Sequence, residues 1–70
     1  MLMKSWTSRE LLKRLFADGW VIKHQVGSHV QLVHPRKAGK VTVPHPNKDL
    51  AAGTIKSIAR QAGIDLEAEP

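Results

Sequence analysis

The chain has 70 residues, with 11 lysines and arginines against six acidic residues, a formal net charge of +5 and no cysteine. This length suits one domain, and the lack of cysteine excludes disulfides and thiolate metal sites as supports for its core. No apolar run reaches the roughly 18 residues of a membrane span, and no apolar stretch at the start fits a signal peptide. We therefore expect one domain over residues 1–70, without a membrane segment, that stays in the cytoplasm.

The first predicted element is a helix that begins after Thr7. Thr7 and Glu10 have the spacing of a capping box, in which each side chain accepts a hydrogen bond from the other residue's backbone N–H. Gly19 supplies the left-handed residue at which many helices end. The apolar stripe of this helix comprises Leu11, Leu12, Leu15 and Phe16. All three aromatic residues are predicted to lie in the core: Trp6, Phe16 and Trp20.

Three β-strands are predicted next, because β-branched residues recur and polar and apolar residues alternate. Gly27 and Ser28 fit a hairpin turn, and Pro44 suits the end of the last strand. The strands are expected at residues 20–26, 29–34 and 40–44.

A second helix is predicted over residues 51–62, with Gly63 as its left-handed cap. Its buried face is expected to comprise Ala51, Ile55, Ile58, Ala59 and Ala62. The element order favours an α+β fold, a two-layer α-β-β-β-α sandwich with both helices on one face of an antiparallel sheet. We expect an ordered core over about residues 6–64 and a frayed acidic tail over 65–70. The other face of the sheet is then open to solvent, where function is expected.

Positive charge is concentrated in the middle of the chain. Between Gly19 and Lys48 there are five basic side chains and no acidic one, and all four histidines lie in the same stretch. A surface with only positive charges favours binding of a polyanion, and nucleic acid is the commonest polyanion. The simpler alternative is a soluble protein that is merely basic. Because the core is expected to take the aromatic residues, recognition by base stacking is not predicted.

Alternation along the strands predicts which side chains reach the open face. The expected inward positions are Trp20, Ile22, Val30, Leu32, Val41 and Val43, with His24 at the rim of the core. The expected open face comprises Lys23, Gln25, His29, Gln31, Val33, Lys40 and Thr42.

On this face, His29 is the residue best suited to chemistry on RNA. Cleavage requires a base for the 2′-hydroxyl proton and an acid for the leaving oxygen, and histidine serves as either near neutral pH. Lys23 and Lys40 are placed to stabilise developing negative charge. The preceding Gly27 and Ser28 allow backbone N–H groups to face an anion. The simpler alternative is an ordinary exposed histidine.

The remaining histidines have weaker claims to function. His34, at a strand end, is expected to be structural or to face a phosphate, and His45 to contact a phosphate or carry a second proton. A zinc site formed by these histidines is the more specific alternative. However, His29 and His34 are five residues apart on one strand and face opposite sides, and no carboxylate or thiolate is near. No metal is therefore predicted.

An ordered set of short motifs runs from about residue 11 to residue 64. They are Asp18-Gly19-Trp20, Gly27-Ser28-His29, Val43-Pro44-His45, Lys48-Asp49-Leu50, Gly53-Thr54-Ile55-Lys56-Ser57-Ile58 and Gln61-Ala62-Gly63-Ile64. The set resembles the HicA toxins. The resemblance implies a fold like that of double-stranded-RNA-binding domains, cleavage of mRNA without a metal or other cofactor, and His29 as the catalytic residue. It also implies inhibition by a HicB antitoxin that covers the active face.

The sequence thus predicts the toxin of a type II toxin–antitoxin system, an endoribonuclease with Gly27 and Ser28 as its active-site turn and His29 as its acid or base. RNA contacts are expected from Lys23, Gln31, Arg36, Lys37, Lys40, His45 and Lys48. Two alternatives stay open: a non-catalytic RNA-binding module, and an interaction domain whose basic face meets an acidic partner.

Overall fold

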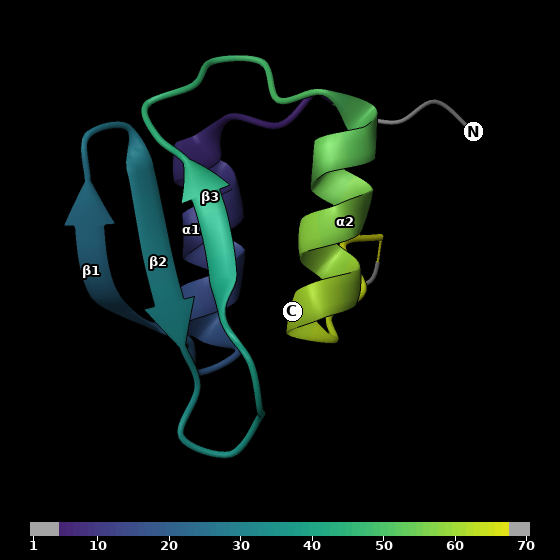
Figure 1. The fold of residues 1–70 in the computed structure, drawn as a ribbon. Coiled ribbons are helices and arrows are strands. Elements are labelled where there is room, and N and C mark those ends of the chain that lie inside the picture. Colours follow the sequence, from purple (N-terminus) through teal and green to yellow (C-terminus); the bar gives the residue numbers. More distant parts are fainter. Residues whose placement is uncertain (1–4, 68–70) are drawn as a thin grey trace.

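Two helices and a three-stranded antiparallel sheet make up the computed structural model, which describes residues 5–67 (Figure 1). The elements in chain order are α1 (Ser8–Ala17), β1 (Val21–Val26), β2 (His29–Val33), β3 (Val41–Pro44) and α2 (Ala52–Ala62). The sheet has the order β1-β2-β3, so that β1 and β3 are its edges. The predicted order of elements is confirmed, and the bounds of the three strands and of α2 lie within one residue of their expected places.

Helix α1 begins and ends as its local sequence predicts. The backbone N–H of Glu10 donates to Thr7 Oγ1 over 3.1 Å, and the N–H of Thr7 donates to the Glu10 carboxylate over 3.0 Å. Asp18 caps the other end, and Gly19 follows with a φ of 103°. Helix α2 likewise ends at Gly63, which has a φ of 66°.

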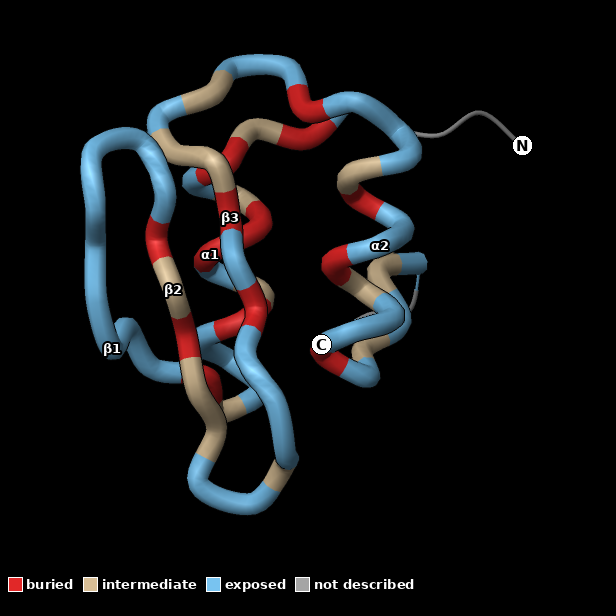
Figure 2. The backbone as a smooth tube through the Cα atoms, in the orientation of Figure 1, coloured by how far each residue is buried: buried red, intermediate tan, exposed pale blue. Residues whose placement is uncertain are grey.

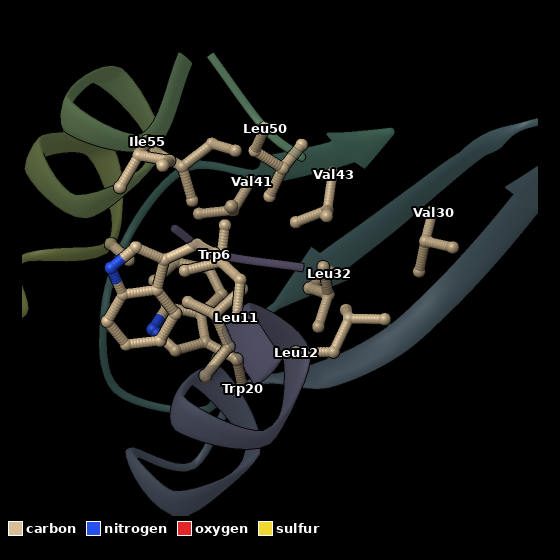
Figure 3. Packing of buried hydrophobic residues seen from close by; sticks show 13 residues of the cluster. Trp6, Leu11, Leu12, Trp20, Val30, Leu32, Val41, Val43, Leu50 and Ile55 are labelled. Carbon is tan, nitrogen blue, oxygen red and sulfur yellow. The ribbon is translucent and has the colours of Figure 1, made fainter. Parts of the chain in front are cut away.

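The core lies between the helices and the inner face of β2 and β3. Figure 2 shows buried positions along α1, β2, β3 and α2, and Figure 3 shows their side chains packed together. The strand residues of this core are the four predicted for β2 and β3: Val30, Leu32, Val41 and Val43. Both tryptophans are buried as predicted. Of the expected inner face of α2, Ile55, Ile58 and Ala62 are buried, whereas Ala59 is half-buried and Ala51 is exposed.

Two large apolar side chains expected in the core are about half exposed. Phe16 is 45% exposed, because it lies about 100° around α1 from the buried Leu15 and beyond the packed stripe. Ile22 is 49% exposed, since all six residues of the edge strand β1 are exposed. The sheet therefore buries two strands and leaves the third uncovered.

Strand β1 contains a β-bulge at Lys23. Ile22 lies opposite Leu32, and His24 lies opposite Gln31, so that Lys23 has no partner of its own in the register. Such an extra residue resets the alternation of side chains along the strand.

The bulge reverses two of the predicted orientations. Residues directly opposite one another in an antiparallel pair point to the same face. Gln31 lies between two buried residues of β2 and points away from the core, so its partner His24 lies on the open face. Gln25, opposite the buried Val30, lies on the helix side. The predictions for His24 and Gln25 are therefore wrong.

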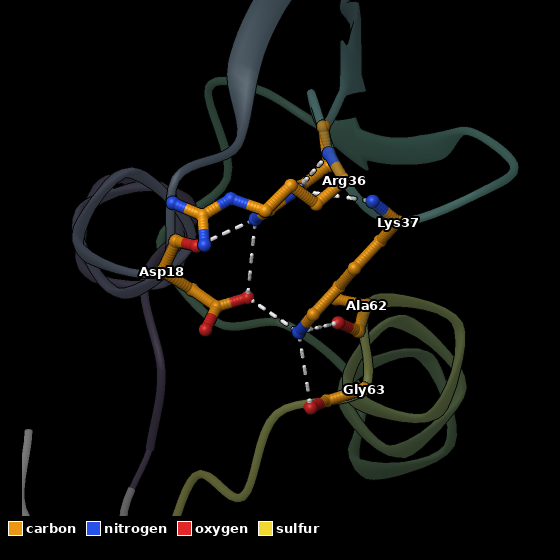
Figure 4. A network of polar contacts seen from close by, with 6 residues as sticks. Asp18, Arg36, Lys37, Ala62 and Gly63 are labelled. Atoms are coloured by element: carbon orange, nitrogen blue, oxygen red, sulfur yellow. Dashed lines mark hydrogen bonds and ion pairs between the residues drawn. The ribbon is translucent and has the colours of Figure 1, made fainter.

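Lys37 joins the two helix ends to the β2–β3 loop (Figure 4). Its ammonium donates to Asp18 Oδ2 over 2.6 Å, to the carbonyl of Ala62 over 2.9 Å and to the carbonyl of Gly63 over 3.3 Å. The two carbonyls belong to the end of α2, where a cation is favoured by the helix dipole. All three donors of this ammonium are thus used within the fold.

The ion pair of Asp18 with Lys37 is expected to weaken in acid. Lys37 holds the pKa of Asp18 below its usual value of 3.8, so the pair stabilises the fold above about pH 4. This contribution is lost as the pH falls through the lowered pKa. Because each side chain is about one third exposed, we expect about 0.5 kcal/mol at pH 7. Urea unfolding of the wild type and Asp18→Asn should show this difference at pH 7 and a smaller one at pH 2.

The matched control is Asp49→Asn, which changes an exposed carboxylate in the loop before α2. It should leave the free energy of unfolding nearly equal to that of the wild type at both pH values. An Asp18→Asn difference of the same size at pH 7 and pH 2 would contradict the role of the charge.

The start of the C-terminal tail is held against α1. The Arg14 guanidinium donates to the carbonyls of Asp65 and Leu66 over 3.0 and 3.3 Å, and Leu66 packs partly buried against the core. The expected fraying therefore does not begin at residue 65. Residues 68–70 of the predicted tail lie outside the described residues.

Candidate active site on the open face

Gly27 and Ser28 form the turn of the β1–β2 hairpin, and His29 is the first residue of β2. Gly27 has a φ of 55°, a conformation that glycine adopts at little cost. All three residues are exposed. The turn therefore presents the His29 imidazole at one end of the sheet, on the face away from the helices, as the sequence predicts.

The cross-strand register arranges the open face in rows. From the turn, the rows are Val26–His29–Pro44, then His24–Gln31–Thr42, then Val21–Val33. Lys23 is exposed at the bulge, and Lys40 is exposed just before β3. None of the described strand residues is a carboxylate. The face combines two imidazoles, neutral hydrogen-bonding groups and lysines, which suits an anionic ligand.

The loop after β3 is hydrogen-bonded to the Gly27-Ser28 turn and to α1. The backbone N–H of His45 donates to the carbonyl of Ser28 over 2.7 Å, and His45 Nδ1 lies 2.6 Å from Ser8 Oγ. Ser8 Oγ also accepts the N–H of Asn47 over 2.9 Å, and Ser8 is only 2% exposed. The start of α1 thereby fixes the loop beside His29. The half-buried His45 ring faces Ser8, and a phosphate contact from it stays a prediction.

Replacing Ser8 with alanine is expected to lower the free energy of unfolding by about 1 kcal/mol, because the half-buried N–H of Asn47 loses its side-chain acceptor. Urea denaturation measures this loss. Ser57→Ala is the matched control, since Ser57 is exposed on α2 and alanine is the better helix former. Equal stability of Ser8→Ala and Ser57→Ala would contradict the importance of this link.

The predicted RNA contacts do not gather at one place. His29 begins β2, whereas Arg36 and Lys37 follow its other end, and a five-residue strand spans about 13 Å. Lys40 lies at that far end too, and Lys48 lies in the loop at the end nearer His29 (Figure 1). The exposed lysines and Arg36 are accessible to a ligand. Lys37 would first have to give up its bonds to α2 and Asp18.

His34 has a structural role, which is one of the two roles that the sequence predicts for it. Its Nδ1 accepts the backbone N–H groups of Arg36 and Lys37, over 2.9 and 3.2 Å. The proton of the neutral ring therefore lies on Nε2, which donates to the carbonyl of Asp18 over 2.7 Å. The ring also packs edge-on against Trp20, at 5.2 Å between centroids.

The described residues include neither a cluster of metal ligands nor a membrane-spanning helix. Within residues 5–67, no three histidine, aspartate or glutamate side chains are grouped so that they could hold a metal ion. Neither helix of this part is long and apolar enough to cross a bilayer.

Comparison with protein families gives a match over residues 8–64 to the model of the HicA toxin of bacterial toxin–antitoxin systems. The match covers more than half of the chain. The chain belongs to the HicA toxin family. Among solved structures, it is similar to a chain of the HicA3 and HicB3 toxin–antitoxin complex, with 40% sequence identity and a TM-score of 0.71.

That alignment covers 87% of this chain and 98% of the HicA3–HicB3 chain, and it confirms the predicted fold class. The comparison with curated proteins finds no match. Membership of the HicA family agrees with the resemblance inferred from the motifs around Gly27-Ser28-His29. The structure adds His24, a face residue that strand alternation assigned to the core rim. Only the pairing register reveals it.

Proposed function

We propose that this HicA-family chain is the single-domain toxin of a type II toxin–antitoxin system, acting in the cytoplasm as an endoribonuclease on mRNA. The observation that carries the proposal is the exposed His29 imidazole, presented by the Gly27-Ser28 turn on a sheet face whose described strand residues include no carboxylate. The likeness to a chain from the HicA3 and HicB3 complex supports a HicB-type antitoxin as the protein partner.

The proposed reaction is an internal transfer at phosphorus. His29 takes the proton of a ribose 2′-hydroxyl, and the freed oxygen attacks the adjacent phosphorus. The bond from phosphorus to the 5′ oxygen breaks, and that oxygen receives a proton. The products are a 2′,3′-cyclic phosphate and a 5′-hydroxyl end. Lys23, which borders the same face next to His24, would stabilise the negative charge that builds on the phosphate, whereas Lys40, at the far end of the sheet, would contact the RNA backbone away from it.

The test is incubation of the purified protein with mRNA in the presence of EDTA. We expect cleavage products with 5′-hydroxyl ends, undiminished by EDTA because the proposed site uses no metal. Addition of the HicB-type antitoxin should stop the reaction. RNA that is bound but stays intact at high protein concentration would contradict the proposal and favour the non-catalytic RNA-binding module.

A salt titration addresses the third possibility, an interaction domain with an acidic protein partner. Contacts with phosphates release counterions, so the affinity for RNA should fall steeply as the salt concentration rises. RNA affinity too weak to measure at low salt would favour the interaction domain.

A further inference from the structure

The open face holds a second imidazole beside that of His29. Val26 lies directly opposite His29 in the register, and His24 lies two residues before Val26 on the same face of β1. His24 is therefore the diagonal cross-strand neighbour of His29. The bulge at Lys23 permits this arrangement, because it lets Ile22 point to the helix side while His24 points outward.

The separation of the two rings suits a single phosphodiester. Diagonal neighbours across an antiparallel pair have Cβ atoms about 7 Å apart. Two side chains at that distance reach opposite sides of one phosphate group, which is what displacement in line at phosphorus requires. Both histidines are exposed, and neither ring has a hydrogen bond or an ion pair to another residue of the described part.

The surroundings of the two rings contain basic side chains and no acidic residue of the described strands. The charged groups next to the face are Lys23 at the bulge and Lys40 before β3, and both helices lie on the other side of the sheet. None of the described residues on the three strands is acidic, so no carboxylate of the sheet pairs with either imidazole. The other histidines are engaged elsewhere, His34 with Asp18 and His45 with Ser8.

We propose that His24 is the second proton-transfer group of the reaction, the general acid that completes the work of His29. As His29 removes the 2′-hydroxyl proton, protonated His24 donates its proton to the 5′ oxygen while the phosphorus–oxygen bond breaks. Exchange with water then returns both rings to their starting states. The inference rests on the proposed ribonuclease function, and it names the residue that shares the proton transfer.

The experiment compares wild type, His24→Ala and His29→Ala on two substrates. The first is an RNA oligonucleotide, and the second is a nucleoside 3′-(4-nitrophenyl phosphate), whose leaving group departs without a proton. On RNA, His24→Ala should lower kcat by about 10²- to 10⁴-fold, and its pH–rate profile should lose one of the two limbs. On the nitrophenyl substrate, His24→Ala should cleave at nearly the wild-type rate, whereas His29→Ala should stay slow.

The matched control is Gln25→Ala, which changes the next residue of β1, on the helix side of the sheet. It should cleave RNA at the wild-type rate, and an oligonucleotide with a 2′-deoxy scissile position should bind all the variants with similar Kd. An unchanged kcat for His24→Ala on RNA would overturn the inference. So would a His24→Ala variant that is equally slow on both substrates. If the wild type cleaves neither substrate, the proposed function itself fails.

Discussion

Replacing His29 with alanine is expected to lower the rate of RNA cleavage by about 10³-fold, the effect of removing a general acid or base. If the proposed function holds, expression of the wild type without antitoxin should arrest growth, and expression of His29→Ala should not. Because the side chain is exposed at the start of β2, its loss should change the free energy of unfolding by less than about 0.5 kcal/mol. The variant should therefore fold and bind RNA like the wild type while failing to cut it.

Three measurements check this expectation: single-turnover cleavage of a labelled RNA, RNA affinity at fixed salt, and urea unfolding. Lys13→Ala, on the exposed surface of α1, is the control that removes one charge away from the open face. A His29→Ala protein that cuts RNA at the wild-type rate would remove His29 from the mechanism. Loss of cleavage together with unfolding would assign His29 a structural role instead.

Replacing Gly19 with alanine is expected to cost about 3 kcal/mol of folding free energy. Gly19 has a φ of 103°, where a side chain is strained by about 1–2 kcal/mol. A Cβ atom there would also lie 2.8 Å from Nε2 of His34, the atom that donates to the carbonyl of Asp18. Since a domain of this size is stabilised by only about 5 kcal/mol, much of the margin would be lost.

Substitutions at two other glycines separate the cost of backbone strain from the cost of the contact with His34 in the same experiment. Gly39 has a φ of 86° with no atom within 4 Å of a Cβ, so Gly39→Ala should cost only the backbone strain. Gly53 lies in α2 with equally open surroundings, and Gly53→Ala should stabilise the fold by about 0.5 kcal/mol. Urea midpoints should rank Gly53→Ala highest and Gly19→Ala lowest. Equal losses at Gly19 and Gly39 would show that His34 moves aside.

Local signals predicted most of the fold. The capping box of Thr7 and Glu10 and the left-handed Gly63 involve residues close in sequence, and both are observed. Alternation also predicts the inner faces of β2 and β3. It fails on β1, where counting inward positions from Trp20 takes no account of the extra residue at Lys23. A bulge is defined by pairing with the neighbouring strand, and one additional residue reverses every later position.

The sequence predicts the place of His29 in the candidate site, but it does not predict what the basic residues around it contact. His29 carries its own signal, because the turn before it and the alternation of β2 are both local. The basic residues carry no such signal, since their charge does not state what they contact. Lys37 is bound to the carbonyl of Ala62, 25 residues away in sequence, and only the tertiary structure reveals that bond.

The bulge in β1 also affects how readily the exposed edge of the sheet can pair with another chain. The outer edge of β1 is unpaired within the sheet, and the strand exposes Val21, Ile22 and Val26. An edge of this kind invites another chain to add a strand, which is how many β-proteins aggregate. The bulge interrupts the row of free backbone groups, and it does so at the lysine of the strand. A charged, irregular edge resists such stacking, so we expect β1 to disfavour association between copies of this chain.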